Sequence, residues 1–514
     1  MIRPAFFPLA ASLLGVVPAQ AAQLYDQGGL NIRWDNTLRY SVGTRLEEPS
    51  SEILLLPNGD DGDRAFAPGL MTNRVDLLSV LDLTKPDFGA QISVAAWYDT
   101  VYHARNDNGS PTVNAISVPS NKFVRATRNI DGQYAEFADS FVYANLELVG
   151  MPLSLRIGRQ TLLWGESVFF NQNSISAAQA PVDYVKSAST PDGYAKSTFL
   201  PVNQISFTLQ PLSGISLAGY YQLEWRPDRL PGVGSYFSTT DLQGAGTERA
   251  LLPGSDLLHV ADTRATNNGQ YGVSLHASLN EIDLGLYALR FDSKYPVLQL
   301  LRNTTGNPTS FRSVYPGGSE LYGASLSGYV GNTAVAGELS VRRNTPLANL
   351  SPIFLNLPSP IRGTNSPAYA EGDTFNGLIS SVAAIGPTSI WDSADFTSEI
   401  ALSGLLSATQ RLQSLSPRQD DWAISGRVEF KPHYFEVLPN LGVDLLFGLG
   451  FNSASDPSID YENNSGTGDL EIGISATYLS VWKVDLTLTS YLGSPVRQPL
   501  SDRNFLLLAL ERAI

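Results

Sequence analysis

Chemically active side chains are concentrated in one short run near the end of the first third of the chain. The run supplies three aromatic rings, a carboxylate and a hydroxyl: Trp164, Glu166, Ser167, Phe169 and Phe170. Inside a pore, charged groups of this kind gate the passage of solutes, and aromatic rings contact apolar cargo. We therefore take this run as the first candidate functional segment.

A predicted strand leads into this run. Leu153, Leu155 and Ile157 alternate with polar or small residues, which is the period of a strand with two unlike faces. The alternation stops after Leu162, and a long connection follows. We predict that residues 163–201 form a structured, functional loop.

The charged residues around this loop have two interpretations. Arg156 and Arg159 precede Glu166, and Asp183 and Lys186 follow it. In the first interpretation, these groups form a constriction or gate inside a pore. In the second, Glu166 pairs with Arg159 or Arg156 and pins the loop to a wall, because ion pairs are often structural. For the ion pair alone we favour the second interpretation, and both can hold together.

A second candidate loop contains Tyr236, Phe237 and Asp241. The Gly-x-Gly pattern just before them follows no buried parallel strand and opens no helix, which argues against a nucleotide site. We expect these three side chains to pack against the loop at 163–201.

Three carboxylates lie close together near residue 60: Asp60, Asp61 and Asp63. Their oxygens could hold a calcium ion, which prefers oxygen ligands. The spacing departs from that of an EF-hand loop, which also needs a closing Glu. We favour a solvated turn and keep a structural calcium ion as the alternative. No other cofactor is expected.

Nothing in the sequence supports an enzyme or a nucleic-acid-binding protein. The four histidines are scattered and match no metal-binding spacing, and no nucleophile elbow is present. The formal net charge of −15 disfavours binding to nucleic-acid phosphates. Because the chain has no Cys, thiol chemistry and a disulfide scaffold are excluded.

The composition favours a membrane barrel. Only 16% of the residues are charged, and 10% are aromatic. After the N-terminus, no apolar run approaches the roughly 20 residues that a spanning helix needs. A membrane protein without such helices must satisfy its backbone hydrogen bonds in a closed barrel.

The N-terminus predicts export. Arg3 is followed by an apolar core and by Ala19-Gln-Ala21, which has the small-x-small form of a cleavage site. We expect residues 1–21 to be a signal peptide and residues 22–514 to form one barrel. The expected location is the outer membrane of a Gram-negative bacterium, in contact with its lipids.

The alternation of apolar and polar residues predicts a series of strands, and one polar face repeatedly carries charges of both signs, as a wet lumen would. In the strand at 333–343, Glu338 and Arg342 share a face that we place in the lumen. The other expected strands lie near 30–42, 73–84, 89–102, 135–148, 152–162, 202–211, 215–226, 270–279, 282–292, 320–330, 395–407, 422–430, 470–476 and 504–513.

The connections alternate between tight turns and long polar segments, which predicts periplasmic turns and external loops. Counted back from the C-terminus, one descending strand is missing between 333–343 and 395–407, and residues 377–385 are the best candidate for it. We therefore predict an all-β fold, a transmembrane antiparallel barrel of about 16–18 strands. With the strand at 377–385 included, the number of strands is even, 18. We also expect one long loop to fold into the lumen.

The string Arg156-Ile-Gly-Arg-Gln-Thr-Leu-Leu-Trp-Gly-Glu-Ser167 resembles that of domain-of-unknown-function family 1302 of Gram-negative envelope proteins. The resemblance extends through Pro181-Val-Asp183, Gly234–Asp241 and Glu399, and spans nearly the whole chain after the signal. It implies an outer-membrane barrel. It also implies a periplasmic lipoprotein-like partner and an inner-membrane exporter of the RND (resistance-nodulation-division) type. The cargo would then be a hydrophobic molecule such as a lipid.

From the sequence we favour the passage of an apolar or amphipathic molecule across the outer membrane, with the loop at 163–201 as its gate. A porin for small polar solutes is the alternative. The aromatic residues of the loop favour the first function, and the charges on the predicted lumen face favour the second. A structural or adhesive surface protein with a blocked lumen is a third class.

Overall fold

The computed structural model describes residues 22–189, 198–305, 307–347, 369–410, 421–452, 466–495 and 497–514. The predicted signal peptide, residues 1–21, lies outside the described residues. So do residues 190–197 of the predicted pore loop.

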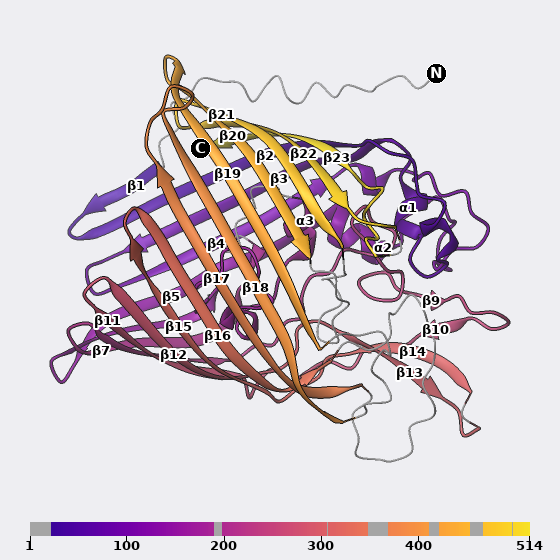
Figure 1. Cartoon of the computed structure of the whole chain (residues 1–514), viewed down its shortest axis with the longest axis horizontal. Helices are drawn as coiled ribbons and strands as arrows, with labels where there is room; N and C mark the ends of the chain where they lie inside the picture. Colours follow the sequence, from indigo (N-terminus) through magenta and orange to yellow (C-terminus); the bar gives the residue numbers. More distant parts are fainter. Residues whose placement is uncertain are drawn as a thin grey trace.

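Eighteen antiparallel strands close into one barrel, with β23 paired to β2 (Figure 1). This confirms the predicted fold class and the even strand count. A closed sheet has no unpaired edge, which a membrane barrel requires. The barrel strands are β2 (Leu30–Arg45), β3 (Gly69–Thr84), β4 (Phe88–Asp99), β5 (Gln133–Leu148), β6 (Met151–Gln160), β7 (Val202–Leu212), β8 (Ile215–Gln222), β11 (Tyr271–Leu279), β12 (Ile282–Phe291), β15 (Ser319–Val330), β16 (Thr333–Pro346), β17 (Glu371–Ile385), β18 (Ser393–Gln410), β19 (Trp422–Leu438), β20 (Leu441–Asn452), β21 (Gly468–Tyr478), β22 (Trp482–Leu492) and β23 (Phe505–Ala513).

The short strand β1 (Ala22–Gln27) extends one edge of the barrel. It pairs with Leu30–Trp34 of β2, whereas β23 pairs with Thr37–Arg45 of the same strand. β1 therefore covers the part of the β2 edge that the shorter β23 does not reach.

Most predicted strands are confirmed within a few residues. The descending strand inferred near 377–385 is β17, and it pairs with β16 and β18 as the count required. The strand predicted over 89–102 is too long, because β4 ends at Asp99. The Asp99 carboxylate accepts the backbone N–H of Val101 at 2.9 Å and that of Asn73 at 3.1 Å, which ends the ladder. The strand predicted over 215–226 likewise ends early, at Gln222.

Tight turns and long connections alternate along the barrel, as predicted. The turn between β5 and β6 consists of Val149 and Gly150, both with positive φ, which is the geometry of a two-residue hairpin. The long connections and the small elements they contain gather at the opposite end, on the right in Figure 1.

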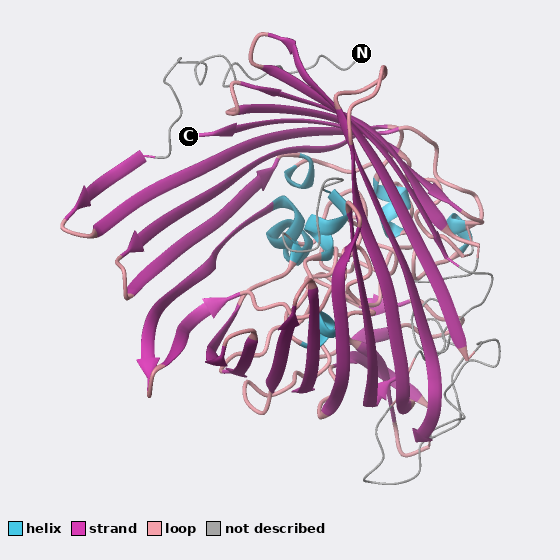
Figure 2. Cartoon of the chain, turned by 60° about the vertical axis from the view of Figure 1, so that its left-hand side comes forward, coloured by secondary structure: helices cyan, strands magenta, loops and turns pink. Residues whose placement is uncertain are grey.

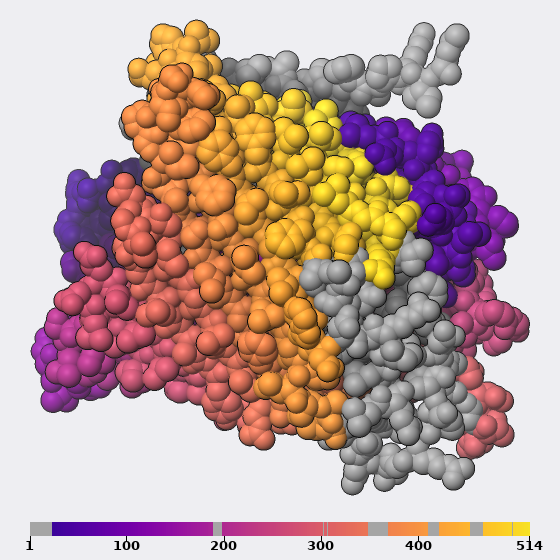
Figure 3. Space-filling model, in the orientation of Figure 1, coloured from indigo at the N-terminus to yellow at the C-terminus, as the bar shows by residue number. Residues whose placement is uncertain are grey.

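Large apolar side chains are exposed on one face of the barrel strands. Figure 3 shows one side of the wall, where the C-terminal strands pack against one another as a continuous surface. Examples from around the barrel are Tyr40, Val75, Val142, Leu286, Leu339, Ile379, Ile400, Phe447 and Leu508. Such exposure suits a lipid environment.

The connections form short elements of their own. The helices are α1 (Asp61–Ala65), α2 (Arg125–Thr127) and α3 (Tyr184–Ser189), with 3-10 turns η1 (Ile53–Leu55), η2 (Val101–His103) and η4 (Ile175–Ala178) and one π-helical turn η3 (Arg128–Gly132). Among the described residues, no helix is both long and apolar enough to cross a membrane.

Two of the segments predicted as plain loops contain strands. β9 (Arg249–Ala250), β10 (Leu257–His259), β13 (Val297–Arg302) and β14 (Pro308–Val314) form a separate four-stranded sheet. Its small core contains Leu242, Leu257 and Phe311, which are all buried. These strands are too short for their alternation to stand out in the sequence.

Candidate functional site in the barrel lumen

The connection that follows β6 folds back into the barrel before the chain rejoins the wall at Val202. Figure 2 shows helical elements within the ring of strands. The connection contains η4 and α3. We call its residues 161–189 the pore segment. Its hydrogen bonds to β16, β17 and β18 place it against the inner face of the wall.

Glu338, on β16, binds the pore segment at two places. Its Oε1 accepts the backbone N–H of Glu166 and, at 3.0 Å, that of Ser167, while its Oε2 accepts that of Ile175 at 2.9 Å. The Ser174 hydroxyl donates to the same carboxylate at 3.2 Å. The Glu338 side chain is buried. Hydrogen bonds to a carboxylate are stronger than neutral ones, so this group clamps the segment.

Glu399, on β18, forms a second clamp next to the first. Its carboxylate accepts the backbone N–H groups of Val168 at 2.5 Å, Phe169 at 3.3 Å and Phe170 at 2.7 Å. The Ser167 hydroxyl donates to it at 3.0 Å. Successive amides that converge on one anion form a nest, and here the anion is supplied by the barrel wall.

Gly165 is required where the pore segment meets Glu338. Its φ is +100°, which L side chains rarely adopt, and a Cβ at this position would overlap the Glu338 carboxylate. The Gly of the Trp-Gly-Glu-Ser run is thus explained by a close approach to the wall.

Further polar contacts hold the same stretch. Arg342, also on β16, donates from Nη2 to the carbonyls of Gln172 at 2.7 Å and Ser174 at 2.9 Å. Ser380, on β17, donates to the carbonyl of Glu166 at 3.2 Å. The predicted luminal position of Glu338 and Arg342 is confirmed, and both bind the pore segment.

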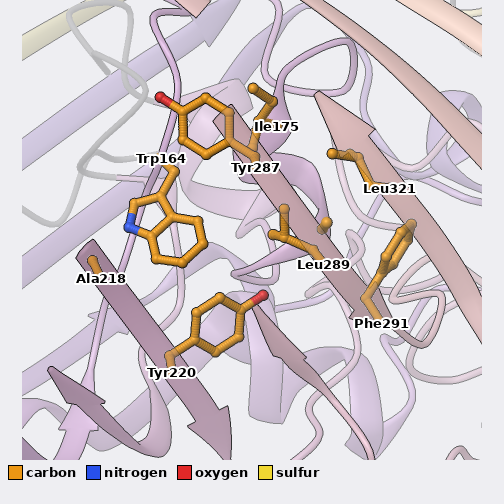
Figure 4. Close-up of a cluster of buried hydrophobic side chains, with 9 residues drawn as sticks. Trp164, Ile175, Ala218, Tyr220, Tyr287, Leu289, Phe291 and Leu321 are labelled. Carbon is orange, nitrogen blue, oxygen red and sulfur yellow. The ribbon is translucent and has the colours of Figure 1, made fainter. Parts of the chain in front are cut away.

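Trp164 anchors the apolar side of the pore segment (Figure 4). Its ring is 9% exposed and lies 5.2 Å from the ring of Tyr220 on β8 and 6.0 Å from that of Tyr287 on β12. Ile175, which is fully buried, belongs to the same cluster. The predicted contact of Trp164 with cargo is therefore not available in this structure, because the ring is enclosed by protein.

The other residues of the run are less enclosed than Trp164. Phe169 and Phe170 are partly exposed, and the guanidinium of Arg427 lies 5.5 Å from the Phe169 ring. The Glu166 carboxylate accepts a long hydrogen bond, 3.5 Å, from the hydroxyl of Ser325 on β15. Glu166 thus points toward the wall on the side of β15.

The predicted ion pair of Glu166 with Arg159 or Arg156 is wrong. Arg159 binds the carboxylate of Glu224 at 2.8 Å, and the guanidinium of Arg156 lies 5.2 Å from the ring of Phe141. The tertiary structure explains this difference. The chain turns after β6 and places Glu166 at other strands of the wall, where Glu338 accepts its backbone N–H.

Asp183 and Lys186 lie at the start of α3, where the pore segment meets the next long connection. Asp183 pairs with Arg229 at 2.5 Å and accepts the backbone N–H of Lys186 at 3.1 Å. Arg229 also pairs with Glu136 on β5, and its guanidinium lies 4.7 Å from the ring of Tyr134. This group joins two inward segments to the wall.

Where the structure describes the loop at 163–201, the rings of Tyr236 and Phe237 pack elsewhere, contrary to the prediction. The Tyr236 ring lies 5.3 Å from that of Phe66, and the Phe237 ring lies 5.6 Å from that of Phe505. Asp241 accepts a backbone N–H from helix α1 at 3.3 Å. These residues contact the first long connection and the start of β23 instead. Barrel closure brings the two ends of the chain together at this place.

The acidic residues near position 60 divide into two groups. Carboxylate oxygens of Asp60, Asp61 and Asp241 lie within 4.8 Å of one another, and all three residues are buried. The predicted ligand Asp63 lies outside this group and pairs with Arg503 at 2.6 Å. The predicted solvated turn is also wrong, because the connections around it enclose these side chains.

Asp63 links the first and last strands of the barrel. Arg503 donates to both of its carboxylate oxygens, at 2.8 and 2.6 Å, and Arg45, the last residue of β2, lies 3.3 Å from it. All three side chains are fully buried. We call these residues the seam cluster, since they sit beside the closure between β2 and β23.

A cavity of about 170 Å³ lies between the pore segment and the wall. Phe291 and Tyr295 line its apolar part, and Asp228, Lys294 and Arg342 line its polar part. Burial raises the pKa of Asp228 to about 6, although Lys294 opposes the shift. Burial also lowers the pKa of Lys294 to about 8. The cavity offers both rings and charges to a small molecule.

Sequence reasoning missed the roles of Glu338 and Glu399. Both were visible as carboxylates near the middle of predicted strands, with apolar residues on either side of Glu338 and Glu399 in the alternation. That signal identifies a luminal charge, but the partner, a row of backbone amides from residues 166–175, has no side-chain signature. Only the folded chain brings the two together.

The fold and its lumen define a closed transmembrane-type barrel with a clamped inward segment. The chain belongs to the protein family of unknown function DUF1302, whose model matches residues 3–513. This confirms the family resemblance read from the sequence. Among proteins with curated descriptions, none matches this sequence.

Several solved structures are similar to this chain at low sequence identity. OccAB4 of Acinetobacter baumannii is 10% identical, with a TM-score of 0.46 over 97% of this chain and 100% of that one. OpdK of Pseudomonas aeruginosa, solved with vanillate, is 11% identical, with a TM-score of 0.41 over 94% and 98%. The outer-membrane channel DcaP of A. baumannii is 11% identical, with a TM-score of 0.39 over 96% and 100%.

Proposed function

We propose that this chain is a channel of the Gram-negative outer membrane, with the pore segment as its constriction. The observation that carries the proposal is the pair of wall clamps, Glu338 and Glu399, which hold residues 166–175 inside a closed barrel. A structural or adhesive barrel has no need for a segment bound at this depth. Apolar outer faces and charged inner faces fit a lipid environment outside and water inside.

The solutes we propose are small and carry a polar or charged group. Arg427 on the inner wall pairs with Asp469 at 2.5 Å and with Glu429 at 3.2 Å, and also pairs with Glu471. Such fixed charges of both signs favour hydrated solutes. The largest ring of the pore segment, Trp164, is enclosed and offers no apolar track.

A hydrophobic or amphipathic cargo is the second candidate. The cavity supports it, because Phe291 and Tyr295 face the same space as Lys294 and Arg342. A molecule with an apolar body and one acidic group would suit both parts. The partners implied by the family resemblance, a periplasmic lipoprotein-like protein and an RND-type exporter, belong to this candidate and remain a proposal.

Single-channel conductance in planar bilayers, followed by liposome swelling with small sugars, tests the proposal. We expect small or flickering conductance for the intact chain, and larger, steady conductance after deletion of Gly165–Ser174. Unchanged conductance after the deletion would remove the pore segment from the pathway. Sugar uptake would favour polar solutes, whereas a closed barrel that co-purifies with lipid would favour the second candidate.

A further inference from the structure

Three connections meet at the carboxylates of Asp60, Asp61 and Asp241. Asp60 and Asp61 lie at the start of α1, in the first long connection, and Asp241 comes from the connection after β8. Asn114, from the connection after β4, donates its backbone N–H to Asp61 at 3.1 Å. The meeting point therefore joins segments that lie far apart in the chain, at the long-loop end of the barrel.

The negative charge at this point is only partly compensated. Arg64 binds the Asp60 carboxylate at 2.7 Å. The nearby Arg249 is engaged elsewhere, with Asp256 at 2.7 Å and the carbonyl of Val113. Among the residues that the structure describes, these three buried carboxylates thus share one directly bound cation. Removing charges from water without partners is costly, so these carboxylates must either take up protons or bind a further positive group.

Several oxygens at this point are buried without a hydrogen-bond donor. They are Oδ1 of Asp61, Oδ1 of Asp241 and Oδ1 of Asn114. Asp241 and Asn114 are each 1% exposed, and Asp61 is 5% exposed. The second oxygen of each Asp does have a donor, since the backbone N–H of Asp61 binds Asp241 and that of Asn114 binds Asp61. The unpaired atoms are all acceptors, which suits a bound cation.

The spacing also fits one ion. One carboxylate oxygen from each Asp lies within 4.8 Å of the others. Calcium binds oxygens at about 2.3–2.6 Å, so ligands on opposite sides of one ion are about 5 Å apart. Calcium accepts carboxylate and amide oxygens together, and the same shell has room for water.

We propose that Asp60, Asp61 and Asp241 bind one calcium ion, with the Asn114 amide oxygen as a further ligand. The ion ties the connections after β2, β4 and β8 to one another. Its role is to hold the long-loop end of the barrel in one arrangement. The proposal does not depend on what the lumen conducts.

Without a cation, protons neutralise part of the charge of this site. Burial raises the pKa of Asp61 to about 7 and that of Asp60 to about 6. Burial, and then the charges of Asp61 and Asp60, raise the pKa of Asp241 well above its usual range. A divalent cation would remove the repulsion that contributes to these shifts.

Direct calcium binding is the test. The full-length mature chain is purified in detergent, freed of lipopolysaccharide and treated with a chelator, and calcium chloride is then titrated by calorimetry. We expect one ion per chain, with a dissociation constant of about 0.1–1 mM, as for extracellular calcium sites. We also expect calcium to raise the midpoint temperature of thermal unfolding by several degrees. No saturable binding at millimolar calcium would overturn the proposal, whether or not any variant folds.

Two matched variants locate the site. Asp241→Asn should weaken calcium binding at least tenfold and remove the thermal shift. Glu48→Gln removes a carboxylate from an exposed position in the same first connection and should leave both unchanged. If Asp241→Asn does not fold, Asp61→Asn takes its place. Equal binding by the folded Asp variant and by wild type would place calcium elsewhere and refute the assignment.

Discussion

At the scale of single residues, two wall carboxylates determine where the pore segment lies. Glu338 and Glu399 each accept several backbone N–H groups, and hydrogen bonds to a charged group contribute about 1.5–3 kcal/mol each. Because most of these bonds use backbone donors, the side chains of residues 166–175 can vary while the clamp remains, apart from Ser167 and Ser174, whose hydroxyls also donate to the carboxylates. Gly165 is a further exception, since only its missing side chain permits the approach.

Replacement of both clamps should release the pore segment. In the double variant Glu338→Gln, Glu399→Gln, an amide replaces each carboxylate and leaves several backbone N–H groups with weaker acceptors. We expect severalfold higher conductance with normal barrel assembly. Bilayer recordings measure the first and heat-modifiable gel mobility the second. Glu320→Gln, whose carboxylate accepts a bond from Tyr322 on β15, is the matched control. Wild-type conductance in the double variant would contradict the clamp.

Gly165→Ala should act in the same direction. The added methyl group would overlap the Glu338 carboxylate at a φ of +100°, so the turn must move away from the wall. We expect a conductance between those of the wild type and the double clamp variant. Gly150→Ala, in the turn between β5 and β6, changes another Gly with positive φ that has nothing within 4 Å, and should leave conductance unchanged.

At the scale of elements, the pore segment is held by an apolar face as well as by its clamps. Trp164 and Ile175 pack against side chains of β8, β12 and β15 (Figure 4). This cluster explains why a ring precedes the Gly-Glu-Ser turn. The pore segment thus packs on the inner wall through an apolar face as well as through polar contacts.

Trp164→Ala should undock the segment while the barrel stays closed. Truncation of a buried Trp costs about 3–5 kcal/mol, and here the loss falls on one docked element. We expect faster hydrogen exchange in residues 161–189 and faster tryptic cleavage after Lys186, with unchanged exchange in the wall strands. Trp391→Ala, in the exposed turn between β17 and β18, is the control. If the segment is protected equally in both variants, the cluster does not hold it.

The charge of the cavity should respond to pH. Asp228, with its pKa raised to about 6, is ionised at pH 7.5 and protonated at pH 5, while Lys294 and Arg342 stay positive at pH 5. The cavity therefore becomes more positive as the pH falls. We expect the reversal potential in a salt gradient to shift toward anion selectivity between these two values. Asp228→Asn should show a smaller shift of the reversal potential. A shift equal to that of the wild type would show that Asp228 is not the group that titrates.

At the scale of the whole molecule, the seam cluster joins the two ends of the barrel. Asp63 binds Arg503 and Arg45 with all three side chains buried. The first long connection therefore reaches over the closure and binds residues that flank both β2 and β23. This arrangement couples the order of the external connections to the closure of the sheet.

Asp63→Asn should weaken this closure. Removing one partner from a buried ion pair costs about 3–5 kcal/mol. Here Arg503 loses both of its bonds to this carboxylate, and Arg45 is left with Asp502. We expect the heat-modifiable transition of the folded barrel to occur at a lower temperature. Asp107→Asn, at a residue that accepts a single hydrogen bond from Ala67 on the same side of the barrel, is the control. Equal transition temperatures would show that the seam cluster does not stabilise closure.

The architecture could be read from the sequence because it depends on local periods. The alternation along β2 and β16, the tight turn predicted at Gly150–Pro152 and the missing strand at 377–385 all depend on neighbours in the chain. In a barrel, consecutive strands are also neighbours in space, so local pattern determines topology. The family resemblance was also visible in the sequence, because a contiguous stretch around Trp164 carries its most specific residues.

The contacts between connections were decided by the tertiary structure alone. Sequence proximity suggested that Glu166 pairs with Arg159 and that Asp60, Asp61 and Asp63 act together. The folded chain instead sends Glu166 to the far wall. It also assigns Asp63 to the seam cluster and brings Asp241 to Asp61. Barrel closure brings these distant segments together, and no period along the chain records which of them will meet.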